Sequence, residues 1–323
     1  MALWTDIVDP AELTAFSRVA QENTDTGILN TVLPNLFQDD VKFTWKVNQI
    51  LADEAEYGEF DTEAPIGQNA AAEEKTMRLL PISRKNPISE YEQLTDPEAV
   101  SARADEKAIE ITQFITNRIN RARAEVLVTG RLNLKENGIV QNVNFGRAAK
   151  LTNAAPASLW SASGADPISD LQKWVEELID TGGVPPEYLI GSTKIASAMG
   201  SAIAAAGYIT TTSPTVSRAA VNDVLDAHSL PRLTVYDGRL LKRRYIPEDT
   251  LVLAPASGLA GRTVFAPTVE SRDPRYNLPT GAASGIIAGL YREDDPPIAW
   301  VLGKAISVPV LSNPDTTLSA KVL

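Results

Sequence analysis

The sequence predicts an α+β fold with an extended arm, one very long helix, and a second unit that mixes helices and strands. Three observations predict it. A polar, glycine-punctuated segment covers residues 41–94, and a single apolar stripe with helical spacing follows it. Beyond residue 166, helix-like and strand-like stretches are mixed, which favours α+β or α/β with a central sheet. A long arm before a long helix is typical of a protein that reaches its neighbours, not of an enzyme built around a pocket.

The first 40 residues form the predicted N-terminal arm. A short amphipathic helix is expected from Pro10 to Gln21. The segment 41–94 is then expected to be extended and loop-like, with strand-like ends at 42–47 and 75–82. These ends frame a polar middle, so we expect this segment to project from the rest of the chain.

The long helix is predicted from about Pro97 to Thr129, which is about 50 Å at 1.5 Å per residue. Thr95 and Glu98 have the spacing of a capping box, and Pro97 lies where a first-turn proline is tolerated. Gly130 provides the stop, because glycine adopts the left-handed C-terminal conformation readily. The apolar stripe consists of Ala104, Ala108, Ile111, Ile115, Ile119, Ala122 and Val126. A coiled coil is the alternative, but the heptads are not sustained.

A hairpin and a second unit are expected after this helix. The stretch 138–151 alternates like a hairpin strand, and a new unit starts near Asp166. There Ser169 can cap a helix that Gly182 and Gly183 close. The other expected elements are a strand at Tyr188–Ile190, a helix at Lys194–Ala206, strands at Leu233–Tyr236 and Leu251–Leu253, and a β-prone run at Ala299–Leu311.

Composition excludes several classes of function. The chain has no cysteine, so it forms no disulfides, thiolate metal sites or cysteine nucleophiles. The net charge of −11 argues against tight nucleic-acid binding, which needs a clustered positive surface. No apolar run approaches the length of a membrane span, so no membrane association is expected.

The sequence offers little catalytic chemistry, and we expect no catalytic, cofactor or metal site. His228 is the only histidine and cannot serve as both base and ligand. The run Gly191–Lys194 lacks the order of a phosphate loop and is better explained as a strand-to-helix turn capped by Ser192 or Thr193. Paired acids such as those at 176–177 and 294–295 are more typical of solvated faces than of a glycosidase, because aromatic residues make up only 6% of the chain.

Two basic clusters leave two interpretations open. They are Lys242, Arg243 and Arg244, and Arg118, Arg121 and Arg123. Contact with packaged nucleic acid or an acidic partner is one interpretation. Ion pairing within or between subunits is the other, and it is favoured in so acidic a protein.

Several short motifs in collinear order resemble the E-type major capsid proteins of tailed bacteriophages, the family that includes the phage lambda major head protein. The resemblance covers the chain from about residue 35 to its end. The motifs are Tyr57–Phe60, Glu63–Gly67, Leu80–Lys85, Ser89–Tyr91, Ile246–Leu253, Leu259–Thr263 and Pro309–Asp315. Each motif is modest alone, and their order carries the resemblance.

The resemblance implies the Hong Kong 97 capsid fold. Residues 1–40 would be the N-terminal arm and 41–94 the extended loop that lies across a neighbouring subunit. Residues 95–165 would be the peripheral domain with its spine helix, and 166–290 a mixed α/β axial domain. Residues 291–323 would return to the peripheral domain.

The implied function is a major capsid protein that assembles as hexamers and pentamers into an icosahedral shell around double-stranded DNA. Implied partners are copies of the same chain, a separate scaffolding protein, a portal and, as an open option, a decoration protein; proximity to packaged DNA is non-specific. The virion is the implied location, after assembly in the host cytoplasm. The residues expected at contacts between subunits are Tyr57, Phe60, Glu63, Glu73, Glu74, Arg78, Arg84 and Lys85.

Two other functions stay open at this point. An encapsulin-like nanocompartment would share the fold and enclose enzymes instead of a genome. An acidic glycoside hydrolase would need one carboxylate whose neutralisation abolishes turnover. Covalent cross-linking between subunits also stays open, because the required lysine, asparagine and glutamate cannot be placed in this sequence.

Overall fold

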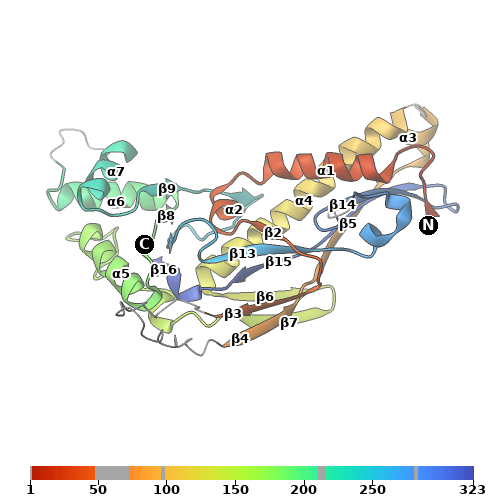
Figure 1. Ribbon diagram of the computed structural model, residues 1–323. Helices are drawn as coiled ribbons and strands as arrows, with labels where there is room; N and C mark the ends of the chain where they lie inside the picture. Colours follow the sequence, from red (N-terminus) through yellow and green to blue (C-terminus); the bar gives the residue numbers. More distant parts are fainter. Residues whose placement is uncertain (1, 48–72, 96–98, 210–215, 280–282) are drawn as a thin grey trace, which may run out of the picture.

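A computed structural model of the chain describes residues 2–47, 73–95, 99–209, 216–279 and 283–323 (Figure 1). Its elongated shape has the long helix α4 (Val100–Thr129) running along one half and a cluster of shorter helices at the other end. No helix in these ranges is long and apolar enough to cross a membrane.

The largest sheet lies beneath α4. Its strand order is β1 (Ala2–Leu3), β14 (Ile287–Arg292), β15 (Ala299–Leu311), β13 (Gly261–Ala266) and β2 (Asn35–Phe37), and β5 (Pro81–Ile88) also pairs with β15. All pairings are antiparallel except that of β2 with β13. The β-prone run predicted at Ala299–Leu311 is therefore confirmed, as the strand that joins three others.

Helices α1 (Pro10–Thr24) and α4 cover one face of this sheet (Figure 1). Every residue of the predicted α4 stripe is buried, and the stripe packs on β15 and α1 instead of forming a coiled coil. The approach to the sheet is close, since a Cβ on Gly303 would lie 2.3 Å from Cγ2 of Ile111. Glycine at that position lets the helix sit directly on the strand.

The two ends of α4 differ in how well the sequence predicted them. Gly130 has φ +64° and its N–H donates to the carbonyl of Val126 at 2.8 Å, as expected for a left-handed stop. The predicted start was wrong, because α4 begins at Val100 without a side-chain cap. Thr95 instead ends a separate helix, α3 (Glu90–Thr95), where its hydroxyl donates to the carbonyl of Tyr91 at 2.7 Å. Pro97 and Glu98 lie outside the described residues.

A buried arginine ties the N-terminal arm to α4. The guanidinium of Arg123 donates to Asp25 at 2.6 Å, to Asn35 at 2.6 Å and to Asn30 at 3.0 Å. Its Nε donates to Thr263 of β13 at 2.8 Å. Arg123 and Asp25 are both buried, so this charge pair is satisfied entirely within the subunit. It fixes the short helix α2 (Ile28–Val32) and β2 beside the large sheet.

The second sheet forms the core of the other unit. Its order is β16 (Leu318–Lys321), β12 (Thr250–Ala254), β8 (Tyr188–Gly191) and β9 (Leu233–Val235). Helices α5 (Pro167–Gly182), α6 (Thr193–Ala205) and α7 (Arg218–Ala227) share an apolar core with it. The predicted strands and helix of this unit are confirmed within one or two residues, and α7 was missed. Asp166, not Ser169, caps α5, because the Asp166 carboxylate accepts the N–H groups of Ile168 and Ser169.

Both sheets cross the boundaries that the sequence suggested. Strand β13 lies within 166–290 and β14 runs across the boundary at 290, but both pair with β15 in the large sheet. Strand β16 lies within 291–323 but joins the second sheet through β12. Where the sheets meet, Arg147 donates to the carbonyls of Leu127 and Val128 at 2.7 Å each. Burial lowers the pKa of Arg147 to about 10, which leaves it charged at neutral pH.

Three two-stranded antiparallel sheets are also described. They are β3 (Lys42–Lys46) with β4 (Glu74–Arg78), β6 (Arg131–Glu136) with β7 (Ile139–Asn144), and β10 (Arg239–Leu240) with β11 (Arg243–Arg244). Single turns of 3₁₀ helix occur at Ala149–Leu151, Glu270–Arg272, Pro274–Tyr276 and Pro314–Thr316. The strand-like ends predicted for the extended segment are thus confirmed as β3 and β4. A hairpin beside the long helix is also present, but the strand predicted at 138–151 ends at Asn144, and its partner β6 was not predicted.

Candidate functional site

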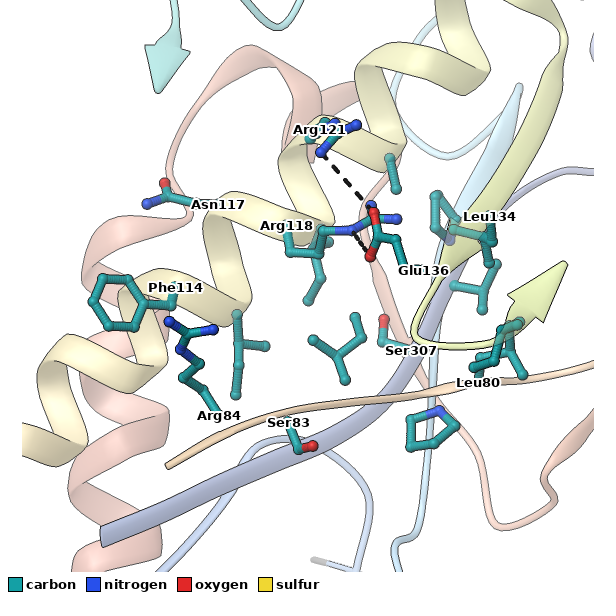
Figure 2. Close-up of a pocket in the computed structure, with 18 of the residues that line it drawn as sticks. Leu80, Ser83, Arg84, Phe114, Asn117, Arg118, Arg121, Leu134, Glu136 and Ser307 are labelled. Atoms are coloured by element: carbon teal, nitrogen blue, oxygen red, sulfur yellow. Dashed lines mark hydrogen bonds and ion pairs between the residues drawn. The ribbon is translucent and has the colours of Figure 1, made fainter. Parts of the chain in front are cut away.

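A groove of about 450 Å³ lies between α4, β5 and the β6–β7 hairpin. We call it the basic groove. Its floor is formed by buried or half-buried apolar side chains, namely Ile82, Ile115, Ile119, Leu132, Leu134 and Val308. Its rim includes Leu240 and, as labelled in Figure 2, Arg84, Phe114, Arg118, Arg121 and Glu136. An apolar floor with a charged rim is the usual composition of a protein contact surface.

Positive charge predominates on the rim. Figure 2 shows Arg118 and Arg121 turned towards the same carboxylate, that of Glu136, at 3.1 and 4.0 Å. The guanidinium of Arg84 lies 6.0 Å from the ring centroid of Phe114 and has no ion pair among the described residues. Three cations therefore face one anion, which leaves the rim with two uncompensated positive charges. A partner surface that bears carboxylates would be attracted to it.

The β10–β11 hairpin stands at one edge of the groove, since Leu240 belongs to the lining. Its turn is unusual for a two-residue hairpin. Leu241 has φ +55°, a conformation in which a leucine side chain is strained, and the residue is 89% exposed. Three cations near Leu241 are exposed and make no ion pair with a described residue, namely Arg239, Lys242 and Arg243. The hairpin thus presents two leucines and three cations to solvent.

The base of this hairpin is firmly held. The carboxylate of Asp237 accepts hydrogen bonds from the Thr193 hydroxyl, from Arg244 and, at 3.3 Å, from the Thr193 N–H. These bonds lower the pKa of Asp237, with the Thr193 hydroxyl as the largest cause. The hydroxyl of Tyr245 donates to Asn117 of α4 at 3.2 Å. The exposed turn at Leu241 is therefore attached to α4 and α6 through hydrogen bonds at the base of the hairpin.

Five of the eight predicted contact residues lie on described strands or next to them. Glu73, Glu74 and Arg78 are exposed at β4, and Arg84 and Lys85 are exposed on β5. Arg84 is the one of these five that lines the groove. Glu73 pairs with Lys75 at 3.6 Å, and the ammonium of Lys85 lies 4.2 Å from the ring centroid of Trp300. Tyr57, Phe60 and Glu63 lie outside the described residues.

The other candidates from the sequence have local partners. His228 packs edge-on against Tyr208, with centroids 5.3 Å apart. Ser192 caps α6 through the N–H of Ile195 at 3.1 Å, as predicted. In the basic clusters, Arg244 pairs with Asp237 and Arg123 is buried, whereas Lys242 and Arg243 stay exposed. Within the described ranges, no three His, Cys, Asp or Glu residues form a group that could hold a metal.

The sequence did not predict the groove or the exposed leucines Leu240 and Leu241 of the β10–β11 hairpin. Phe114, Glu136 and Leu240 come from three elements far apart in sequence, and no local pattern shows that they meet. The pair Leu240–Leu241 between basic residues was the available signal, because two leucines among cations are unusual in a turn.

The family match and the first two solved structures are to phage proteins. A family model described as phage major capsid protein E matches residues 65–322. A protein described as a prophage capsid protein from E. coli CFT073 is 16% identical, with a TM-score of 0.66 and 100% of both chains covered. A phage-related protein from Bordetella bronchiseptica RB50 is 13% identical, with a TM-score of 0.61 over 99% of this chain and 98% of the other.

The SrpI encapsulin of Synechococcus elongatus is 11% identical, with a TM-score of 0.51 over 92% of this chain and 87% of the other. A search of curated proteins by sequence found no match. At these identities the solved structures show the fold, which is of the Hong Kong 97 capsid type.

Proposed function

The chain belongs to the phage major capsid protein E family, and we propose that its copies assemble as hexamers and pentamers into an icosahedral shell around a double-stranded DNA genome. Membership makes it a phage major capsid protein, a structural protein of the virion. The family match over residues 65–322 carries this proposal. The similarity in fold along the full chain supports it.

Shell formation needs surfaces that bind other copies, and the structure offers several. Glu73, Glu74, Arg78, Arg84 and Lys85 line exposed strands next to the segment we expect to reach a neighbour. The basic groove adds an apolar area with uncompensated charge. Large buried contacts between identical subunits would stabilise the closed shell.

The acidic composition suits a container wall. With a net charge of −11, the chain has no general affinity for the DNA phosphates, so contact with the genome would be weak and non-specific. We propose that the chain has no catalytic site and that a separate scaffolding protein and a portal take part in assembly in the host cytoplasm. A decoration protein on the finished shell is a further option.

The family match favours a phage shell over the two other functions. Likeness to an encapsulin concerns the fold alone, whereas the match over most of the chain is to phage capsid proteins. The glycosidase hypothesis has no support from the described carboxylates. Glu176 and Glu177 lie on the outer side of α5, and Asp294 and Asp295 are exposed in a turn.

Electron microscopy of the recombinant chain, alone and coexpressed with its genomic neighbours, tests the proposal. Closed shells, capsomers or tubular polyheads are expected. A monomer that stays monodisperse under both conditions would overturn it.

A matched pair of variants tests the contact residues. Glu73→Lys with Glu74→Lys should reduce particle yield and leave the subunit folded. Glu22→Lys with Glu176→Lys makes the same change in charge at two other exposed sites and should reduce yield less. Equal yields from both variants would count against the predicted contact role of Glu73 and Glu74.

A further inference from the structure

The end of the molecule that bears α3 has the opposite character to the basic groove. Tyr91 and Leu94 of α3 are 77% and 73% exposed and lie three positions apart on one side of the helix. The carboxylates on α3, on the adjoining face of α4 and in the turn that α3 contacts are those of Glu90, Glu106, Asp294 and Asp295, and none has an ion pair among the described residues. We call this set, with Tyr91 and Leu94, the acidic tip.

Two contacts place α3 beside the start of α4 and beside the turn before β15. Glu92 of α3 pairs with Arg103 of α4 at 3.2 Å, and Gln93 donates to the carbonyl of Pro297 at 3.1 Å. The nearby cations are engaged, since Arg103 and Lys107 form ion pairs and Arg292 lies over the ring of Trp4.

The acidic tip and the basic groove cannot meet within one subunit. The β10–β11 hairpin is attached at Asn117, 17 positions along α4 from its first residue, Val100. That separation is about 25 Å of rigid helix, and α3 lies beyond the start of α4 (Figure 1). Each surface therefore keeps its exposed apolar side chains and unpaired charges in the isolated subunit.

We propose that the acidic tip of one copy docks in the basic groove of a second copy. Tyr91 and Leu94 pack against Leu240, Leu241 and Phe114, and the tip carboxylates lie opposite Arg84, Lys242 and Arg243. This inference rests on the proposed shell function and names the partner of the groove. It also accounts for Leu241, because a strained and exposed leucine in a turn has a use when a partner covers it.

Charge and apolar surface together select this occupant. DNA would give the two exposed leucines no apolar partner. A chain of net charge −11 also has little general affinity for DNA phosphates. Contact of the groove with a second groove would place like charges against each other. The tip matches on both counts, since it offers two exposed apolar side chains together with carboxylates that have no ion pair among the described residues.

The contact has a consequence for assembly. It joins two different surfaces, so a bound pair still offers the free groove of one copy and the free tip of the other. Contacts of this kind form a ring if the rotation between copies closes, and an open chain if it does not. A ring is what hexamers and pentamers require.

Engineered cysteines test the contact directly, because the natural chain has none. Particles of the Leu94→Cys, Leu241→Cys double variant are treated with a short bis-maleimide and separated by denaturing electrophoresis. Tip-to-groove contact predicts a ladder of covalent oligomers, since each copy carries both halves. Leu94→Cys with Val269→Cys is the control, because Val269 is 80% exposed but belongs to neither surface.

Each result has a definite meaning. Particles without the ladder overturn the docking inference and leave the shell function standing, whereas absence of particles even from the natural chain overturns the shell function. Dimers from Leu241→Cys alone would show groove-to-groove contact and overturn the inference. Should the double variant not assemble, the two single-cysteine proteins are mixed at high concentration, where absence of the mixed dimer overturns it.

Charge reversal gives a second test that does not depend on cross-linking. Lys242→Glu with Arg243→Glu should lower particle yield by about tenfold or more, since like charges would then face each other. Adding Glu90→Lys and Asp295→Lys should restore much of it. Lys173→Glu with Arg262→Glu is the matched control at two other exposed cations, neither of which lines the groove. Absence of rescue, with all variants shown to be folded by circular dichroism, contradicts the inference.

Discussion

Arginines on two sides of α4 differ in how their positive charge is paired. Arg123 faces inward, is fully buried, and has hydrogen-bond partners on the arm, on β13 and on α4 itself. Arg118 and Arg121, within two turns of it, face the basic groove and share one partly exposed carboxylate. The positive charge on the inner side of α4 is thus paired within the subunit. On the outer side, two arginines share one carboxylate, so part of the positive charge is available to another molecule. The difference separates the residues that hold the subunit together from those available for assembly.

Removing Arg123 should produce the largest effect on stability. Arg123→Ala leaves Asp25 buried without its partner, which should lower the free energy of unfolding by about 3–5 kcal/mol. Denaturant unfolding of the soluble subunit measures this. Arg121→Ala is the control and should cost at most about 1 kcal/mol, because its ion pair is exposed and long. Similar losses from both variants would remove the distinction between the two sides.

Leu241→Asn should separate stability of the subunit from assembly. Asparagine tolerates a positive φ, so the variant should be more stable than the natural subunit by about 1 kcal/mol. Particle yield should fall, because the apolar tip of the hairpin is lost. Leu240→Asn is the matched variant, since Leu240 has no positive φ and offers no strain to relieve. A Leu241→Asn protein that is both more stable and fully competent in assembly would contradict a docking role.

The anchor of the hairpin should respond to acid. Hydrogen bonds from Thr193 and Arg244 lower the pKa of Asp237 from its ordinary value of 3.8. A carboxylate whose pKa is lower in the folded than in the unfolded chain stabilises the fold fully at pH values above its unfolded pKa. This stabilisation is lost as the pH falls through the lower pKa of the folded chain. Asp237→Asn should therefore flatten the dependence of thermal stability on pH below about pH 4. An unchanged slope would show that Asp237 does not support the hairpin in this way.

The smallest change in stability is expected at Glu136. Glu136→Gln removes the one carboxylate on the groove rim, and the unfolding free energy should change by less than about 1 kcal/mol. Association between copies should strengthen at low salt, because the groove becomes more positive. Light scattering of assembly at two salt concentrations measures it. Weaker association of the Glu136→Gln protein would contradict attraction of an acidic surface to the groove.

The sequence predicted elements whose causes are local. The α4 stripe, the glycine at its end and the Ser192 cap depend on residues within a few positions of each other, and the structure confirms them. The first residue of α4 was predicted wrongly, because Thr95, which the sequence suggested as the cap of α4, ends α3 instead. The order of motifs pointed to the Hong Kong 97 fold without requiring any contact to be known.

Contacts between distant segments could not be predicted in this way. Strand β2 at 35–37 pairs with β13 at 263–265, and no periodicity shows which strands meet. Arg84 was selected as a contact residue from its motif, but Phe114, Glu136 and Leu240 join it only in the folded chain. The strain at Leu241 is a property of the backbone conformation and leaves no trace in composition.

The central claim is that the chain forms a shell through contacts between different surfaces of identical copies. Cryo-electron microscopy of particles assembled from the recombinant chain tests it most directly. The account predicts closed shells of hexamers and pentamers, with density for α3 of one copy in the basic groove of the next. Shells in which every groove faces solvent would contradict the docking contact, and a chain that remains monomeric under all assembly conditions would contradict the shell itself.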